Sequence, residues 1–382
     1  MDYFEKWNIT DQGNRLPYSN RVDISILLQV FSNTATSYKY LYFRALMNIL
    51  AETHFNQLSI RLDEILLEML AIAWYPHTFF KLSFGTNDRI AEELERLELL
   101  VPYAMTWGEE SKNRLKAIIA QKDYFRNDLL RFVPYRLIRP FFANRMIGVN
   151  DSSSNNLIMG LACKEFDETR PFYFIAEDRR SIIMHPDWML YFFDNYTLVQ
   201  AFIAWNWLDY MQRRNPSVPN LQTKLFPPVI RKPIENQKIF WKTVLKHHPT
   251  RCIFSDEPIQ EQQMSLDHFL PWSFVAHDQL WNLIPVSRSI NSAKSNNLPS
   301  LSQYFKRFAD LQYIGLRTYR DNPGTISWNK ITEPYIADLH MRPADLLDRQ
   351  KLYLGLKTTM EPLYALAASQ GFPKDWQWKP DR

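Results

Sequence analysis

The segment 252–300 constrains the fold most, because β-branched and turn-forming stretches follow one another there in a definite order. CIFS (252–255) and a strand near MSLDHF (264–269) flank a polar turn, which predicts a hairpin. WNLIPVS (281–287) is a second strand candidate, and its last residue, Ser287, suits the N-cap of a short helix. The expected order is therefore strand, loop, strand, helix.

Polar groups of this segment are expected to meet at one place. Asp267 and His268 end the first strand, while Asn291 and Lys294 share one face of the helix predicted over 288–295. Carboxylate and amide oxygens are hard ligands that suit Mg²⁺ or Mn²⁺, and a neutral imidazole can take a proton from water. These are parts needed to hydrolyse a phosphodiester. An isolated Asp–His pair is more often structural, so the ordered set is what favours catalysis.

Three blocks of the segment resemble the HNH endonuclease motif: DHFLPWS (267–273), WNL (281–283) and NSAKSNNLP (291–299). The form is similar to the HNH domain of RNA-guided CRISPR nucleases and extends over about 50 of the 382 residues. This resemblance implies a ββα-metal nuclease unit.

The resemblance also implies a role for each matching residue. His268 would be the general base, and Asp267 and Asn291 would hold Mg²⁺ or Mn²⁺. Asn282 would brace the loop that positions the histidine. Lys294 would lie near the scissile or a neighbouring phosphate.

No structural zinc is expected. Many HNH proteins bind zinc through two CxxC pairs, but this chain has two cysteines, Cys163 and Cys252, far apart in sequence. Hydrophobic packing is expected to hold the hairpin instead, with base stacking by its aromatic rings as the alternative. The packing residues are Phe254, Leu266, Trp272 and Trp281.

Two other histidine-containing pairs are interpreted differently. His277–Asp278 falls in the loop between the strands, where it could substitute as a metal ligand, although a surface position is favoured. His247–His248 has no ligand partners at a suitable spacing and is interpreted as a solvated helix end.

The net charge of +4 is unevenly distributed. Residues 231–251 carry six Lys or Arg against one acidic residue, and residues 286–320 carry six more against one. Basic runs on both sides of the motif are expected for a groove that contacts phosphates, with a solvated helix face as the alternative for any one residue. The predicted nucleic-acid-binding residues are Lys242, Lys246, Arg288, Lys294, Lys306 and Arg307.

Composition excludes several function classes. The chain has nine glycines, and neither GxGxxG nor GxxxxGK[ST] occurs, which argues against Rossmann and P-loop nucleotide sites. No signal-peptide pattern and no apolar run of membrane-spanning length is present. Together with the few cysteines, this predicts a cytoplasmic protein without membrane association.

The fold class expected is α+β, mainly helical, with three regions. Residues 1–232 are predicted to be a helical recognition or regulatory part with a strand-rich insert near 132–185. A segment with five prolines, 215–233, reads as an extended connector. The nuclease unit would occupy 233–300, and helices in 301–382 would pack on it.

Within the first region, periodic apolar residues predict helices over 24–52, 63–73, 88–100 and 187–214. FVPYRLIRPFF (132–142) and PFYFIAEDRRSIIM (171–184) have the composition of strands, and DSSSNN (151–156) that of a polar loop.

The function expected is Mg²⁺- or Mn²⁺-dependent hydrolysis of DNA phosphodiesters, with nicking by a monomer. The arrangement of a long helical arm beside an HNH unit resembles bacterial effectors of anti-phage defence, which implies protein partners. Two alternatives remain open: an inactive nucleic-acid-binding or assembly subunit, and an RNA-directed nuclease.

Overall fold

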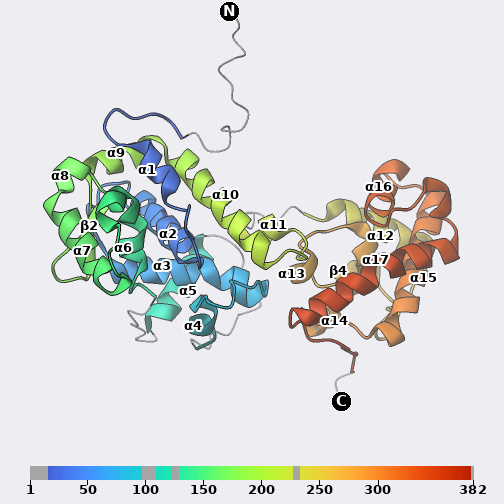
Figure 1. The fold of residues 1–382 in the computed structure, drawn as a ribbon. Coiled ribbons are helices and arrows are strands. Elements are labelled where there is room, and N and C mark those ends of the chain that lie inside the picture. Colours follow the sequence, from blue (N-terminus) through green and yellow to red (C-terminus); the bar gives the residue numbers. More distant parts are fainter. Residues whose placement is uncertain (1–15, 97–108, 122–128, 227–232, 380–382) are drawn as a thin grey trace, which may run out of the picture. The chain divides into compact units, whose positions relative to one another are not determined.

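The protein forms two compact units, Met1–Pro216 and Ser217–Arg382, in a computed structural model (Figure 1). The structure describes residues 16–96, 109–121, 129–226 and 233–379. Helices predominate and the sheets are small and antiparallel, so the prediction of a mainly helical α+β fold is confirmed. The division between the units falls inside the proline-rich segment 215–233.

The first unit is built largely from helices. Its α-helices are α1 (Ile24–Gln29), α2 (Tyr38–Glu52), α3 (Leu62–Trp74), α4 (Ile90–Arg96), α5 (Glu109–Gln121), α6 (Val133–Ile138), α7 (Asp151–Lys164), α8 (Phe166–Thr169), α9 (Pro186–Asp194) and α10 (Tyr196–Arg214). A π-helical turn, η2 (Tyr75–Phe79), extends α3, and a 3₁₀ stretch, η3 (Arg139–Met146), extends α6. Its strands are β1 (Ser59–Arg61), β2 (Tyr173–Ile175) and β3 (Ser181–Met184).

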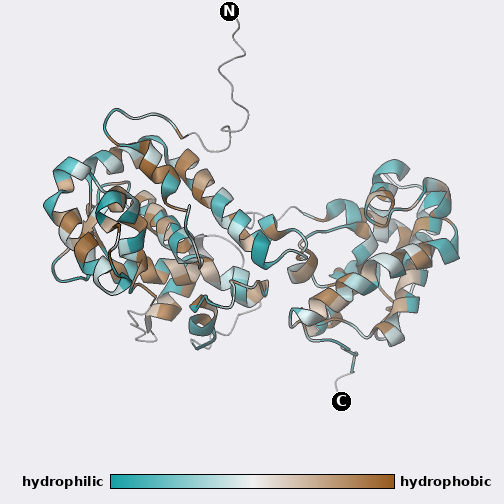
Figure 2. Cartoon of the chain, in the orientation of Figure 1, coloured by the Kyte–Doolittle hydropathy of each residue, from teal (hydrophilic) through white to brown (hydrophobic). Residues whose placement is uncertain are grey.

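Helix α2 is the centre of this unit. It packs against α3 and α10, and buried side chains surround most of its circumference, which is typical of a core helix. Hydrophobic and hydrophilic segments alternate along the surrounding helices, as expected where one face of each is buried (Figure 2).

The helix predicted over 24–52 is interrupted. It divides into α1 and α2, because SNTATS (32–37) offers side chains that hydrogen-bond locally rather than continuing a helix. The helix predicted over 88–100 is present as α4, and its last four residues lie outside the described part of the chain.

The strand-rich insert is smaller than predicted. β3 pairs with β1 on one side and β2 on the other, so the expectation of strands in 171–184 is confirmed. The strand predicted over 132–142 is wrong, because that segment forms α6 and the start of η3. Pro134 and Pro140 lie in the first turns of these two helical elements, where the missing N–H leaves no hydrogen bond broken.

The polar loop predicted for DSSSNN (151–156) is also wrong. These residues form the first turns of α7, which follows Asn150 at its N-cap. Short polar side chains are tolerated at a helix start, and the helix buries a face through Ser154, Ile158 and Ala162 at four-residue spacing.

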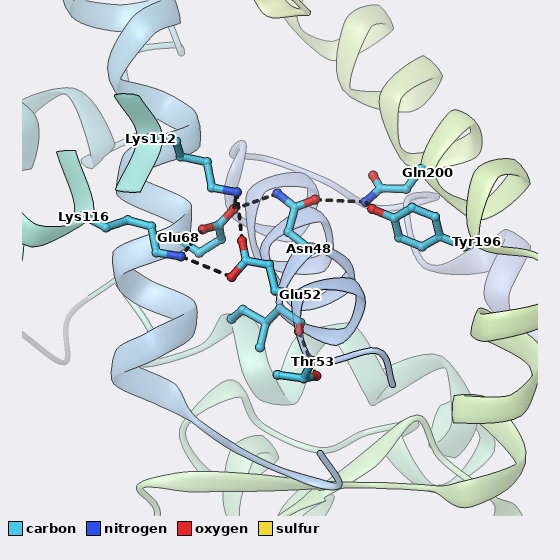
Figure 3. Close-up of polar contacts among 9 residues, drawn as sticks. Asn48, Glu52, Thr53, Glu68, Lys112, Lys116, Tyr196 and Gln200 are labelled. Atoms are coloured by element: carbon cyan, nitrogen blue, oxygen red, sulfur yellow. Dashed lines mark hydrogen bonds and ion pairs between the residues drawn. The ribbon is translucent and has the colours of Figure 1, made fainter. Parts of the chain in front are cut away.

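A buried carboxylate joins α5 to the core of the first unit (Figure 3). Glu68 on α3 has no exposed surface, and its two oxygens lie 2.8 Å from Nζ of Lys112 and 3.0 Å from Nζ of Lys116. Asn48 on α2 donates to the same carboxylate at 2.7 Å. Burial opposes ionisation of Glu68, but the two ammonium groups and the Asn48 amide outweigh it and lower the pKa of this carboxyl.

Replacing this carboxylate is expected to loosen α5. Glu68→Gln should lower the free energy of unfolding of the first unit by about 3 kcal/mol, the lower end for a broken buried pair, because the lysines still contact Glu52. Urea unfolding of both variants measures it. Glu52→Gln is the matched control, since this side chain is 42% exposed and its loss should cost less than about 1 kcal/mol. Equal losses of stability in the two variants would contradict the role of Glu68 in joining α5 to the core.

The second unit contains two strands among its helices. Its α-helices are α11 (Leu221–Leu225), α12 (Glu235–His247), α13 (Trp272–Val275), α14 (Arg288–Lys294), α15 (Leu301–Asp321), α16 (Trp328–Asp338) and α17 (Arg349–Ser369). Short 3₁₀ turns are η4 (Glu261–Gln263), η5 (Leu280–Asn282) and η6 (Pro343–Asp345), and the strands are β4 (Met264–His268) and β5 (Leu283–Ser287).

One hydrophobic core extends through the second unit, from α12 to α17. Its strand residues, such as Leu266 and Ile284, pack with residues of α12, α15 and α17 in this core. Gly315 on α15 allows a close approach, because a Cβ there would lie 3.1 Å from the Trp241 ring of α12. The helices after residue 300 therefore share a core with the strand pair.

A lysine of this unit, Lys224, is buried. Lys224 on α11 is fully buried, and in the part of the chain that the structure describes its Nζ has no hydrogen-bond partner. It lies 5.3 Å from the centre of the Phe274 ring. Burial lowers the pKa of Lys224 from 10.5 to about 7.

The free energy of unfolding of this unit is therefore expected to increase as the pH rises above 7. Between pH 7 and 10.5 the unfolded chain binds a proton at Lys224 that the folded chain does not, so the free energy of unfolding should rise with pH. Lys224→Met should reduce that rise and stabilise the protein by at least ~1 kcal/mol at neutral pH. Urea unfolding at neutral and alkaline pH checks this, with the exposed Lys238→Met as the control. An unchanged pH slope in Lys224→Met would contradict it.

Candidate active site

The site is built on the antiparallel pair β4–β5. Asp267 lies opposite Ile284 and His268 opposite Leu283, at the end of β4 where the loop to β5 begins. The prediction that CIFS (252–255) forms a strand of this hairpin is wrong. Those residues form a turn next to an isolated β-bridge between Arg251 and Pro258. The strand that pairs with β4 along its whole length is β5.

Asn282 closes the loop between the strands. This buried amide accepts a hydrogen bond from the backbone N–H of Leu270 at 2.8 Å and donates one to the Leu270 carbonyl at 2.9 Å. The Phe269 N–H donates to the Asn282 carbonyl at 2.8 Å. The two ends of the loop are thus tied together directly after His268, as the predicted bracing role requires.

Helices that follow the motif support the same loop. Gln312 of α15 donates to the Leu283 carbonyl at 2.9 Å and accepts from the hydroxyl of Tyr335 at 2.6 Å. The Trp281 indole N–H donates to Asp338 of α16 at 2.7 Å. These contacts extend the support well beyond the residues of the motif.

The expected hydrophobic packing is largely present. Phe254, Leu266 and Trp281 are buried in the core of this unit, whereas Trp272 is half-buried. Base stacking is therefore not open to the first three side chains.

Helix α14 begins where the sequence predicts and lies against β4. The Ser287 hydroxyl accepts from the Ile290 N–H and caps the helix. Asn291 donates through Nδ2 to the Ser265 hydroxyl at 2.9 Å, and Lys294 donates through Nζ to the His268 carbonyl at 2.7 Å. The shared face of Asn291 and Lys294 is therefore directed at the strand that carries Asp267.

Lys294 does not occupy the position that the resemblance implies. Its ammonium has no exposed surface and lies 3.2 Å from both oxygens of Asp267, so from this position it contacts a carboxylate rather than a phosphate. Burial raises the pKa of Asp267 and lowers that of Lys294, and each partner opposes the shift of the other. Lys294 pairs with Asp267 because both groups are buried, and a charged ammonium removed from water is stabilised by an opposite charge beside it.

A second carboxylate, missed by the sequence interpretation, contacts His268. The Nε2 atom of His268 lies 2.8 Å from Oδ1 of Asp278, which comes from the loop between the strands. The two side chains are 11% and 21% exposed, so this part of the loop is not the free surface that was favoured. The sequence feature that pointed to this contact was the second His–Asp pair, His277–Asp278. Sequence spacing alone does not show which histidine Asp278 contacts.

His277, the other half of that pair, is directed elsewhere. Its ring packs against Trp281 with 5.2 Å between ring centres, and its Nδ1 accepts from the Gln279 N–H. Burial first, and the charge of His268 second, lower the pKa of His277 to about 4. It is therefore neutral near pH 7.

The candidate ion ligands are one carboxylate and one amide. Within the described ranges, no three His, Cys, Asp or Glu side chains lie close enough to hold a metal ion. The predicted ligand pair, Asp267 and Asn291, combines one carboxylate with an amide and does not depend on a group of this kind. The absence of a structural zinc stays a prediction.

Most of the predicted nucleic-acid-binding residues are exposed. Lys242, Lys246, Arg288 and Lys306 lie at the surface of the second unit. Arg307 is also exposed but pairs with Asp256. The exposed His247 and His248 end α12, which confirms the interpretation of this pair as a solvated helix end. Arg231 and Lys232 lie outside the described residues.

Comparison with known proteins finds a family for the segment that carries this site. Residues 252–300 match the family model of HNH endonucleases. The chain carries an HNH endonuclease domain. It is therefore a nuclease, a phosphodiester hydrolase that acts on nucleic acid. No curated protein and no solved structure gives a significant match to the chain. No helix in the described ranges is long and apolar enough to cross a membrane.

Loss of the Asn282 brace is expected to damage both stability and activity of the HNH domain. Asn282→Ala leaves the Leu270 N–H and carbonyl unpaired in a buried place, which should lower the free energy of unfolding by about 2–4 kcal/mol. Cleavage should fall at least tenfold at a temperature where the variant remains folded. Asn322→Ala is the control, since it removes one hydrogen bond to a helix carbonyl at the end of α15. Wild-type cleavage by Asn282→Ala would contradict the bracing role.

Proposed function

We propose that the HNH domain hydrolyses DNA phosphodiester bonds with a divalent ion, Mg²⁺ or Mn²⁺, and nicks one strand per encounter. The observation that carries this proposal is the meeting of three groups at the end of β4. The imidazole of His268 and the buried carboxylate of Asp267 lie side by side at the end of β4, and the α14 face that carries Asn291 packs against the same strand from another part of the motif.

His268 acts as the general base in this proposal. Its side chain is 11% exposed, so the protein encloses most of the ring. Proton transfer from water to a positioned imidazole contributes ~10²–10⁴-fold to a hydrolysis rate. The Asn282 brace and the Lys294 contact to the His268 carbonyl keep the backbone of this residue in place.

The residues present fit a divalent ion. Asp267 is 3% exposed, and among the described residues its Oδ2 has no hydrogen bond, although the Lys294 ammonium lies 3.2 Å away, so this buried carboxylate oxygen would be the ligand atom. Asn291 uses its amide nitrogen on Ser265, so its carbonyl oxygen is the atom left for an ion. When bound, the ion would supply positive charge that stabilises the leaving oxygen.

Lys294 has a positioning role in this proposal. Its ammonium neutralises Asp267 and connects α14 to the end of β4 through the His268 carbonyl. Contact with the substrate backbone falls instead to the exposed cations, Lys242, Lys246, Arg288 and Lys306. Phosphate contacts of this kind make DNA binding weaken with salt.

A plasmid nicking assay tests the proposed function. Wild-type protein should nick supercoiled DNA with Mg²⁺ or Mn²⁺ and lose activity with a chelator. His268→Ala should nick at least ~100-fold more slowly, because the general base is gone. His248→Ala is the matched control, since this exposed histidine at the end of α12 has no part in the site.

The outcomes separate the candidate functions. Wild-type nicking by a folded His268→Ala would overturn the assignment of the base. Salt-sensitive DNA binding without metal-stimulated nicking would favour an inactive nucleic-acid-binding or assembly subunit. Preferential cleavage of RNA, when DNA and RNA compete in one reaction, would favour an RNA-directed nuclease.

The biological role proposed is that of a cytoplasmic effector in bacterial anti-phage defence. A separate helical unit with its own core supports the idea that Met1–Pro216 recognises a trigger or a protein partner. Phage should then form fewer plaques on bacteria that express the wild-type chain than on bacteria that express His268→Ala.

A further inference from the structure

We propose that Asp278 is a positioning residue that sets the tautomer and ring direction of His268, so that Nδ1 is the atom that takes the proton from water. This inference rests on the proposed role of His268 as general base. The family resemblance concerns the residues of the three motif blocks, and Asp278 lies outside all of them, in the loop between the first two.

The contact itself determines which ring nitrogen carries hydrogen. Oδ1 of Asp278 lies 2.8 Å from Nε2 of His268, which is a short hydrogen-bond distance. An ionised carboxylate can only accept, so Nε2 must be the donor. A neutral imidazole then has its lone pair on Nδ1.

Asp278 is held in place from both sides. Its own carbonyl accepts a hydrogen bond from the Gln237 side chain of α12 at 2.9 Å. Two residues before it, Ala276 caps the C-terminus of α13 with a left-handed backbone, at a φ of 52°. Just after it, Trp281 and Asn282 are anchored to α16 and to the other end of the loop. The carboxylate is therefore in position before any substrate binds.

The two carboxylates near His268 have different partners. Asp267 faces the ammonium of Lys294, with both oxygens at 3.2 Å. Asp278 faces the imidazole ring. The neighbouring His277 is neutral near pH 7 and so does not neutralise Asp278. The two carboxylates therefore have different roles in the proposal: Asp267 would hold the ion, and Asp278 orients the base.

The size of the effect follows from a known case of the same physics. When the aspartate that orients the histidine of a serine-protease triad becomes asparagine, kcat falls about 10⁴-fold although the geometry is intact, because the histidine takes the wrong tautomer. In Asp278→Asn, the new amide N–H can donate to Nε2 and move the ring hydrogen to Nδ1. We expect kcat for nicking to fall about 100-fold, with little change in KM or in DNA affinity.

The tautomer can be observed without turnover. ¹⁵N NMR of the imidazole rings at alkaline pH distinguishes an Nε2–H ring from an Nδ1–H ring. The chain has eight histidines, and a spectrum of His268→Ala assigns the signal of His268. Wild-type protein should give Nε2–H at His268 and Asp278→Asn should give Nδ1–H, with unchanged melting temperatures.

Asp321→Asn is the control. This exposed aspartate at the end of α15 pairs with Arg317 and makes none of the contacts described for the loop between β4 and β5. Its kcat and the tautomer of His268 should therefore stay as in the wild type.

Three results would overturn the inference. They are a wild-type kcat in Asp278→Asn, an unchanged His268 tautomer in that variant, or a fall in kcat that follows a fall in melting temperature. Failure of the proposed function gives a different result from failure of this inference. If His268→Ala nicks DNA at the wild-type rate, the general base itself is misassigned. If His268→Ala is inactive while Asp278→Asn is fully active, only the role of Asp278 fails.

Discussion

The buried ion pair between Asp267 and Lys294 joins the strand that carries His268 to the helix that carries Asn291. Neither charge is stable alone in this environment, so α14 must lie against β4 for either residue to be buried. The second contact of Lys294, to the His268 carbonyl, places the strand end and the helix in a definite register. The geometry of the candidate site follows from this one packing arrangement.

Support for that arrangement comes from far outside the motif. Gln312, Tyr335 and Asp338 belong to α15 and α16, yet they hydrogen-bond to the start of β5 and to the loop before it. The helices and the strand pair also share one hydrophobic core. The family match at 252–300 thus describes the chemistry of the site, while the C-terminal helices provide much of its rigidity.

How far the sequence predicts this protein depends on the range of the interactions involved. The Ser287 N-cap, the helix after it and the shared face of Asn291 and Lys294 were predictable, because contacts within one turn produce them. The strand predicted over 132–142 was wrong, since prolines at two helix starts resemble the punctuation of strands. The role of CIFS was wrong as well, because local composition does not show which segment β4 will pair with.

The sequence by itself determined the chemical groups of the site: a carboxylate, an imidazole, an amide and a lysine in an order that matches HNH endonucleases. Only the tertiary structure decided how these groups pair. It placed Lys294 on Asp267 and Asp278 on His268, although Asp278 follows another histidine directly. The physical reason is that ion pairs and buried hydrogen bonds depend on distance in space and on burial, which a folded loop sets and residue spacing does not.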